Sequence, residues 1–403
     1  MSRNELFYRL ALIVVSVVFT VVMGEVGLRL LSSQDTDGNI YVGSFRVKPY
    51  RLPLNSLKTR IEKSTKSEQT YFQYDQDLGW TVGPNSEFPG GLYISNASGI
   101  RTSSLRRETA AQPLPDILRI AIFGDSFTHG DNVPYEDSWG AILEAQLSQM
   151  GHNVEVLNLG GPGYGMDQAF LRWRKHGKPL KPDIVIFGFQ KSNVKRNMNI
   201  LRFLYSPGSG IIFSKPRFVL DGDHLQLVNV PTLQPKNLIN MLKNFNSWEL
   251  KEHEFFFQKD DYTDRPLYAS RLAAFVTTGL TTKFSTRRKG YAFFAPDSTS
   301  RKLAWRIIEK FEREVTQEGA RFVIVHLPTK KPIDKLVKGK SLKYQDLLHE
   351  MRDNYTVIDP APDLAREAEI DSVEALFEPG SSHYSARANH VIGTTIAKML
   401  LIH

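Results

Sequence analysis

The chain has 403 residues, no cysteine and a formal net charge of +8 at pH 7. That length suggests two or three domains, or one large α/β unit with insertions. The lack of cysteine excludes disulfides, a thiolate nucleophile and cysteine-ligated zinc. The basic residues are scattered and lack the interleaved aromatic residues of a single-strand binding platform, so we expect no nucleic-acid partner. The main basic runs lie at 63–66, 104–107, 286–289 and 329–340.

An apolar segment near the amino terminus indicates a membrane anchor. Apolar or small residues run without interruption from Leu10 to Gly24, after Arg3 and Arg9. A membrane span needs about 20 such residues, which the run reaches only with its apolar neighbours on both sides. We expect an uncleaved signal anchor over 1–31. The basic residues before it would leave the rest of the protein extracytoplasmic.

A cleaved signal peptide and a buried core helix are the alternatives to this anchor. The end of the apolar run, Gly24-Glu25-Val26, lacks a small-x-small cleavage pattern. The next segment, 32–115, is rich in Gly and Pro, so we expect an irregular extracytoplasmic segment of short strands and turns that packs on the main domain.

From residue 116 onward, strand and helix patterns alternate. This order predicts βαβ units, a parallel central sheet and therefore an α/β domain over 116–403. Residues 195–290 interrupt the alternation and read as an insertion that contains a hairpin at 215–231. We expect strands at 117–124, 153–160, 181–190, 321–328 and 355–359, and helices at 135–150, 166–177, 300–319, 341–352 and 384–400.

The stretch IAIFGDSFTHGDN, residues 120–132, places Ser126 immediately after the first strand of this domain. The carboxyl end of a parallel strand is where α/β proteins usually bind ligands. An ordinary turn, with Ser126 capping a helix that begins near Tyr135, would also explain Gly-Asp-Ser. A catalytic serine would require a base and oxyanion donors from elsewhere in the chain.

Three later segments supply such groups. Gly163 follows the second strand and could offer a backbone N–H, and Asn193 follows the third strand and could offer a side-chain amide. His383 lies on a loop just before the last helix and could act as the base. Taken singly, each has a simpler explanation as a turn, a helix cap or a surface loop.

Taken in order, Gly-Asp-Ser, Gly, Asn and a late His resemble the four sequence blocks of the SGNH, or GDSL-type, hydrolases. The resemblance implies a three-layer α/β/α flavodoxin-like sandwich. It implies that Ser126 is the nucleophile and His383 the base. The Ser126 amide, the Gly163 amide and the Asn193 side chain would form the oxyanion hole. The membrane segment with Glu25 and Arg29 resembles the anchored extracytoplasmic members.

Two blocks depart from the family pattern. Val194 stands where the third block often has an aspartate. Gly380 and Ser381 occupy the two positions before His383 where the family places its orienting aspartate. The base could therefore work in a Ser-His dyad, or Glu378 or the more distant Asp371 could replace the aspartate.

Other polar residues near these blocks are less strongly indicated as catalytic residues. Asp125 is expected to cap or brace the turn, and His129 to be a polar residue of the loop, with a substrate contact or a rival base as alternatives. His326, at the end of a later strand, is expected to be structural. No HExxH or similar cluster predicts a metal, and no cofactor is expected.

The sequence therefore predicts a serine esterase or O-acyltransferase. Through the resemblance, its substrate would be a small acyl ester on a cell-envelope or exported glycan. The alternative is a catalytically inactive, membrane-tethered SGNH-like module that binds glycan or serves as a scaffold. A nucleotide-binding protein is disfavoured, because neither GxGxxG nor GxxxxGK[ST] follows a predicted strand.

Overall fold

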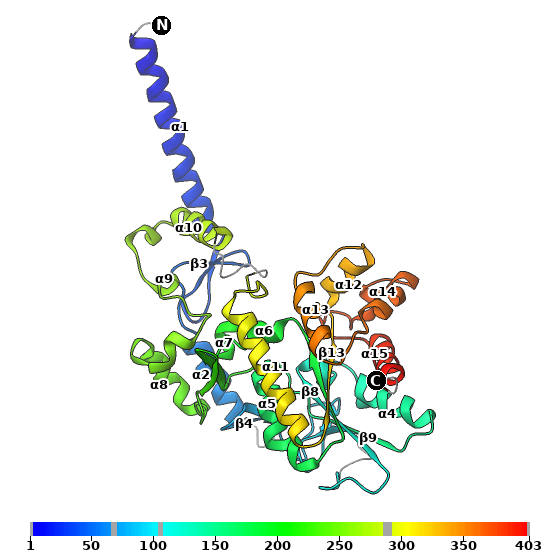
Figure 1. Ribbon diagram of the computed structural model, residues 1–403. Coiled ribbons are helices and arrows are strands. Elements are labelled where there is room, and N and C mark those ends of the chain that lie inside the picture. Colours follow the sequence, from blue (N-terminus) through cyan, green and yellow to red (C-terminus); the bar gives the residue numbers. More distant parts are fainter. Residues whose placement is uncertain (1–2, 66–70, 104–107, 285–291, 401–403) are drawn as a thin grey trace.

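The computed structural model describes residues 3–65, 71–103, 108–284 and 292–400, so the basic runs at 104–107 and 286–289 lie outside the described residues. Its centre is a seven-stranded sheet in the order β14-β13-β10-β8-β9-β7-β6 (Figure 1). Neighbours from β14 to β9 are parallel, whereas β7 and β6 are antiparallel. The predicted α/β fold with a mostly parallel central sheet is confirmed. The strands are β14 Val357–Ile358, β13 Arg321–His326, β10 Ile184–Phe189, β8 Leu118–Gly124, β9 Val154–Asn158, β7 Arg101–Thr102 and β6 Ile94–Ser95.

Both faces of the sheet are apolar, as a sheet with helices on both sides requires. Successive residues of β8 point to opposite faces: Ile120 and Ile122 join one buried cluster, and Ala121 and Phe123 join the other. The first cluster is completed by α4, α12, α14 and α15, and the second by α5, α11 and α13. These helices are α4 Trp139–Gln149, α5 Met166–Arg172, α11 Thr299–Gln317, α12 Lys330–Val337, α13 Gln345–Asn354, α14 Ala361–Ile370 and α15 Ala386–Leu400.

The predicted elements of this domain are present, with shorter bounds. The expected helix at 166–177 is α5 followed by one π-helical turn, and the expected hairpin is formed by β11 Arg217–Asp221 and β12 His224–Val228. Helices α12 and α14 were not predicted. Helix α6, Ser192–Arg196, follows β10, and the insertion adds α7 Arg202–Tyr205, α8 Pro235–Lys243, α9 Lys259–Tyr262 and α10 Arg271–Phe284.

Residues before 116 form small antiparallel units and also extend the main sheet. Strand β7 pairs with β9 at Arg101 and Asn158, so an early segment becomes part of the central sheet. The other elements of this segment are β1 Ser32–Gln34, β2 Ile40–Val42, β3 Phe45–Val47, α2 Leu54–Thr65, β4 Phe72–Asp75 and β5 Gly79–Val82.

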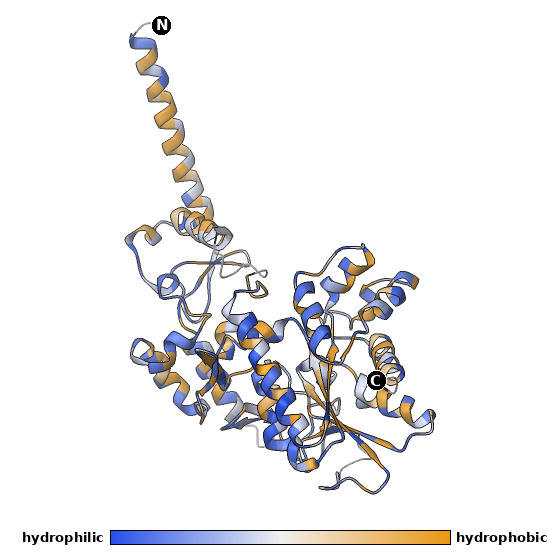
Figure 2. Cartoon of the chain, in the orientation of Figure 1, coloured by the Kyte–Doolittle hydropathy of each residue, from blue (hydrophilic) through white to orange (hydrophobic). Residues whose placement is uncertain are grey.

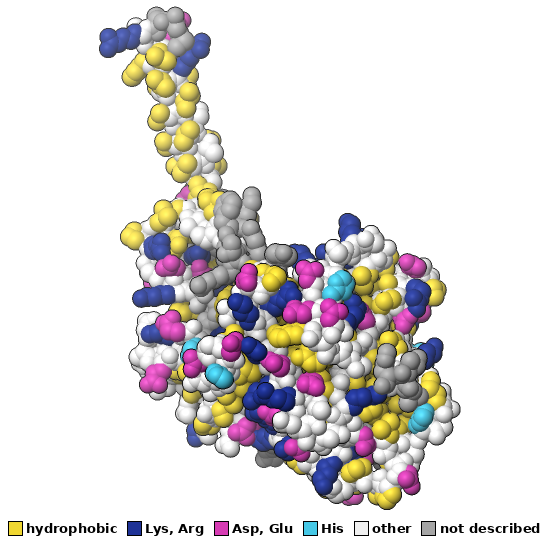
Figure 3. Space-filling model, in the orientation of Figure 1, with side chains coloured by type: hydrophobic (Ala, Val, Ile, Leu, Met, Phe, Trp, Pro, Cys, Tyr) yellow, Lys and Arg dark blue, Asp and Glu magenta, His cyan; other side chains and the backbone are white. Residues whose placement is uncertain are grey.

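Helix α1, Arg3–Leu30, projects from the rest of the molecule and has no buried residue. Within the described residues it is the one helix long and apolar enough to cross a membrane, by length and composition. Its surface is hydrophobic along most of its length (Figures 2 and 3). The length of the helix fits either an anchor or a signal sequence.

The inner end of α1 is joined to α10 by polar contacts. The Glu25 carboxylate accepts hydrogen bonds from the backbone N–H groups of Arg271 and Leu272, at 3.0 and 2.9 Å, and from the Ser270 hydroxyl at 2.8 Å. Arg29 donates to the carbonyl of Ala269 at 2.9 Å. A carboxylate at the amino end of a helix satisfies N–H groups that have no partner within the helix, so Glu25 fixes where α10 begins.

Candidate active site

Ser126 lies at the carboxyl end of β8, where the chain turns abruptly into the short helix α3, Ser126–His129. Asp125 caps this helix, because its carboxylate accepts the N–H of Phe127 at 2.9 Å. The same carboxylate accepts hydrogen bonds from Arg196 at 2.5 Å and from the Asn193 amide at 3.2 Å. Ser126 is therefore the first residue of a braced turn, and it does not cap a helix near Tyr135.

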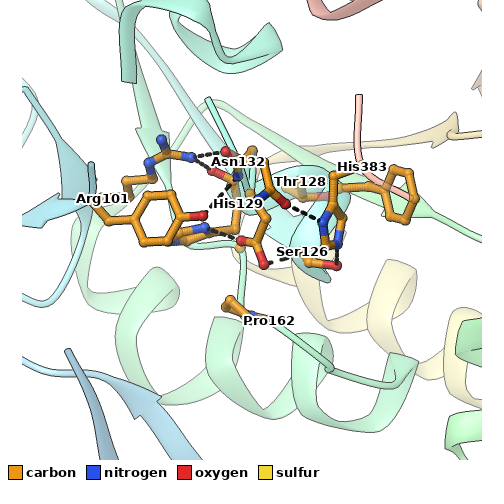
Figure 4. Close-up of polar contacts among 12 residues, drawn as sticks. Arg101, Ser126, Thr128, His129, Asn132, Pro162 and His383 are labelled. Carbon is orange, nitrogen blue, oxygen red and sulfur yellow. Dashed lines mark hydrogen bonds and ion pairs between the residues drawn. The ribbon is translucent and has the colours of Figure 1, made fainter. Parts of the chain in front are cut away.

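The side chains of Ser126 and His383 meet although they are far apart in the sequence. The Ser126 hydroxyl lies 2.9 Å from Nε2 of His383. On the other side of the imidazole, Nδ1 lies 2.7 Å from the side-chain oxygen of Asn132 (Figure 4). The Ser381 hydroxyl is 3.0 Å from the same oxygen and 3.2 Å from Nδ1. The imidazole is thus held between the serine and the Asn132 amide.

This arrangement selects one tautomer of His383. The Asn132 oxygen can only accept, so Nδ1 carries the proton and Nε2 presents its lone pair to the serine hydroxyl. The sequence analysis did not predict Asn132, because the partners it considered for His383, Glu378 and Asp371, both precede the histidine in the same part of the chain. The available signal was the polar run Gly-Asp-Asn at the end of the serine block, where Asn132 has φ +73°.

Asp131 provides a carboxylate close to the same imidazole. Its Oδ2 lies 4.0 Å from Nε2 of His383, and its Oδ1 lies 2.6 Å from Nδ1 of His129. Burial raises the pKa of Asp131 to about 6. A change of charge on Asp131 near neutral pH would therefore be felt by His383.

His129 is fully buried and does not contact Ser126 in any described hydrogen bond. Its Nε2 lies 2.8 Å from the Tyr71 hydroxyl, and its Nδ1 faces Asp131. Burial holds the pKa of His129 well below its ordinary value, so the ring is neutral. Its position behind Asp131 gives it a structural place in the loop.

The backbone N–H groups of Ser126 and Gly163 are two of the expected oxyanion donors. In the described contacts, no hydrogen bond occupies the N–H of Ser126 or of Gly163. Gly163 has φ +78°, and a Cβ there would lie 2.9 Å from Ile211 and 3.3 Å from the Arg202 guanidinium. The positive φ and the close neighbours both favour glycine at this position.

The third expected donor, Asn193, is fully buried and engaged. Its amide donates to the Asp125 carboxylate at 3.2 Å and to the carbonyl of Tyr164 at 3.1 Å. Its oxygen accepts the N–H of Gln190 at 2.6 Å. In this conformation the Asn193 side chain joins the exits of β8, β9 and β10, and both of its N–H groups already have acceptors.

An arginine from the segment before residue 116 donates hydrogen bonds to backbone carbonyls of the serine loop. Arg101, buried in the sheet strand β7, donates to the carbonyls of His129, of Gly130 at 2.6 Å and of Val133 at 2.6 Å. Asn158 adds a bond to the carbonyl of Thr128 at 3.0 Å. These bonds satisfy backbone carbonyls that the turn would otherwise leave buried without a partner.

A second buried arginine, Arg202, lies against Gly163. Two of its nitrogens, Nε and Nη1, are buried and have no hydrogen-bond partner in the described structure. Burial, followed by the nearby charge of Arg196, lowers the pKa of Arg202 to about 9. An incompletely satisfied cation therefore adjoins the backbone donor at Gly163, which the sequence did not suggest.

The remaining candidates lie apart from the imidazole. Glu378 contacts the His383 loop through its backbone, whose N–H donates to the carbonyl of His383 at 3.0 Å. The Asp371 carboxylate bonds to Arg387 at 3.1 Å. His326 is buried between Asp359, at 2.8 Å, and the Tyr344 hydroxyl, at 3.1 Å. Among the described residues, no group of three or more His, Cys, Asp or Glu side chains could hold a metal ion.

No protein-family model and no curated protein sequence matches the chain. Several solved structures match the chain. A member of the lipolytic protein G-D-S-L family from Veillonella parvula DSM 2008 is 13% identical over 71% of this chain and 98% of its own, with a TM-score of 0.35. A lipase/acylhydrolase from Enterococcus faecalis is 13% identical over 70% and 94%, with a TM-score of 0.34.

An acetylxylan esterase from Geobacillus stearothermophilus, solved as a catalytic mutant, is 12% identical over 70% of this chain and 92% of its own, with a TM-score of 0.35. Similarity at this level does not assign an activity to the chain. The chemistry must therefore be argued from its own side chains.

Proposed function

We propose that the protein is a serine-dependent acyl-ester hydrolase or O-acyltransferase that acts on small acyl groups of a cell-envelope or exported glycan. The observation that carries the proposal is the Ser126–His383 contact of 2.9 Å, with His383 Nδ1 bound to the Asn132 oxygen at 2.7 Å. A hydroxyl, a base and a group that orients the base are the three parts of an activated nucleophile.

The geometry supports a double displacement. The Ser126 oxygen forms a bond to the acyl carbon while its proton passes to Nε2 of His383. The N–H groups of Ser126 and Gly163 stabilise the oxygen that becomes negative. When the intermediate collapses, the ester C–O bond breaks and the leaving alcohol takes the proton from Nε2. This step leaves an acyl-serine.

The second half repeats these steps in reverse. A water molecule or a sugar hydroxyl attacks the acyl carbon and gives its proton to Nε2. The bond between the acyl carbon and the Ser126 oxygen then breaks, and that oxygen takes the proton back from Nε2. Water makes the reaction a hydrolysis, and a sugar hydroxyl makes it an acyl transfer. Asn132 keeps the imidazole in the required tautomer but adds no negative charge, so Asp131 is the nearest group that could stabilise the imidazolium.

Helix α1 supports the membrane anchor and the extracytoplasmic substrate in this proposal. Helix α1 has the length and composition of a membrane span, and Arg3 and Arg9 precede its apolar stretch. Positive residues on that side favour an extracytoplasmic location for the remaining residues. Ester-bearing glycans of the envelope would then be accessible to Ser126.

The test compares hydrolysis of p-nitrophenyl acetate by the wild type, Ser126→Ala and His383→Ala. We expect each variant to lose about a thousandfold or more in kcat, because each removes a group needed for acylation. A fluorophosphonate probe should label the wild type and not Ser126→Ala. Equal rates in the wild type and Ser126→Ala, with no labelling, would instead favour a binding module.

A further inference from the structure

Five lysine side chains line one cavity of about 310 Å³ near the carboxyl ends of β10 and β13. Two aromatic residues, Phe294 and Tyr344, also line it. No aspartate or glutamate lines it. We call this space the lysine cavity. Its lysines are Lys191, Lys195, Lys331, Lys335 and Lys343.

The five lysines come from three separate parts of the chain. Lys191 precedes α6 and Lys195 lies within it, Lys331 and Lys335 lie one turn apart on α12, and Lys343 precedes α13. Figure 1 shows these three helices at one end of the sheet. Only the part on α12 belongs to a basic run that is evident in the sequence, at 329–340.

These positive charges are not neutralised within the described residues. None of the five lysines has a carboxylate within ion-pair distance there. Lys335 donates weakly to the carbonyl of Ser341 at 3.4 Å, and Lys195 lies 5.0 Å from the ring of Phe293. Burial, followed by repulsion from the other four lysines, lowers the pKa of Lys191 to about 8. A bound anion would offset this repulsion.

The cavity lies on the edge of the sheet that carries Ser126. Strands β8, β10 and β13 are parallel neighbours, so their carboxyl ends share one edge. Ser126 follows β8, Lys191 follows β10, and α12 follows β13. The strand order β13-β10-β8 therefore places the cavity and Ser126 on the same end of the sheet, with the exit of β10 between them.

We propose that the lysine cavity binds acidic groups of the same glycan chain whose ester Ser126 attacks, so that the substrate is an anionic polysaccharide. This inference rests on the proposed function and narrows its substrate class. Lysines that bind a lipid surface would project from an open face. Here Lys331 and Lys343 are exposed, whereas Lys191, Lys195 and Lys335 are partly buried around a hollow. A polymer segment with spaced carboxylates or phosphates can enter such a hollow, whereas a flat membrane surface cannot.

The test uses the full-length protein in neutral detergent and the triple variant Lys191→Gln/Lys331→Gln/Lys335→Gln. The control is Lys58→Gln/Lys236→Gln/Lys243→Gln, which removes the same charge from exposed positions on α2 and α8. Binding of polygalacturonate and of poly(glycerol phosphate) is measured by calorimetry at two salt concentrations. Activity is measured on acetylated polygalacturonate and on p-nitrophenyl acetate.

We expect the cavity variant to bind one of the two polyanions about tenfold more weakly, with a smaller salt dependence, and the control to stay within twofold of wild type. The polymer that responds identifies the acidic group as carboxylate or phosphate. If polygalacturonate is the polymer that responds, the cavity variant should have a higher KM for acetylated polygalacturonate. Its hydrolysis of p-nitrophenyl acetate should stay unchanged.

Equal binding by the cavity variant and the wild type would overturn the inference, and so would equal weakening in the control. Lysine-dependent binding to vesicles containing anionic phospholipid, without glycan binding, would also overturn it in favour of a membrane contact. A wild type with no esterase activity would refute the proposed function, while calorimetry would still report whether the cavity binds a polyanion.

Discussion

The two loops that bring Ser126 and His383 together are held in different ways. The serine loop, 125–133, is mostly buried, and its polar groups bond to Arg101, Asn158 and Arg196 from three other elements. The histidine loop, 378–385, is more exposed, and the imidazole depends on Asn132 and Ser381. The nucleophile thus lies on a buried loop, whereas the base lies on a partly exposed loop.

This difference predicts separable effects of substitution. Changes to the buried side chains that hold the serine loop, such as Arg101, should lower the stability of the fold, because they leave buried polar groups without partners. Changes to the side chains that contact the imidazole, including Asn132, should lower catalysis with little loss of stability. The substitutions below test that separation, beginning with the largest expected effect.

Asn132→Ala should reduce kcat by roughly a hundredfold, because His383 loses the acceptor that fixes its tautomer. Asn132→Asp should keep most of the activity or increase it, since a carboxylate can accept the same Nδ1 proton. Asn132→Gly is the matched control for the backbone, because glycine accepts the φ of +73° without strain. Steady-state kinetics and thermal melting of the three variants would check this. A rate for Asn132→Ala equal to that of wild type would show that the contact is not needed.

Arg101→Met should lower the free energy of unfolding by about 2–4 kcal/mol, because the carbonyls of Gly130 and Val133 lose buried donors. Urea unfolding monitored by tryptophan fluorescence measures this change. Arg387→Met, which removes a partly exposed arginine paired with Glu367, is the control and should have a much smaller effect. Equal losses in the two variants would contradict the difference between the loops.

Asp131→Asn should remove a step near pH 6 from the pH dependence of kcat/KM. Above that pH the wild-type carboxylate is charged and lies 4.0 Å from the imidazole, where it stabilises the imidazolium. The variant should be about threefold to tenfold slower at pH 7.5 and similar to wild type at pH 5. An unchanged pH profile would show that Asp131 does not act on His383.

The same carboxyl also predicts how stability varies with pH. Its pKa is raised from 3.8 to about 6 on folding, so its favourable contribution is complete below pH 3.8 and is lost as the pH rises through 6. The unfolding free energy of Asp131→Asn should therefore fall less than that of wild type between pH 4 and pH 7. Parallel denaturant titrations across that range provide the measurement.

Glu378→Ala and Asp371→Asn should have the smallest effects, within about twofold in kcat. The contact of Glu378 with the His383 loop is made by its backbone, and the Asp371 carboxylate bonds to Arg387. Steady-state rates on p-nitrophenyl acetate decide the matter. A loss near that of Asn132→Ala in either variant would mean that the carboxylate reaches His383 during turnover.

The sequence predicted the alternation of strands and helices and the position of Ser126 at a strand exit. Those features follow from local patterns, because apolar runs, glycines and helix periodicity depend on near neighbours along the chain. It also offered Gly163 and His383 as partners, through block order and resemblance. It could not indicate that Asn193 turns its amide toward Asp125, since that depends on how three strand exits meet.

The sequence by itself therefore determined the class of fold and the residues available for chemistry. The tertiary structure decided which of them meet: Asn132 with His383, Arg101 with the serine loop, and five lysines around one cavity. The physical reason is that these contacts join segments far apart in the chain, and their short range makes them depend on packing. No local pattern of residues encodes such distances.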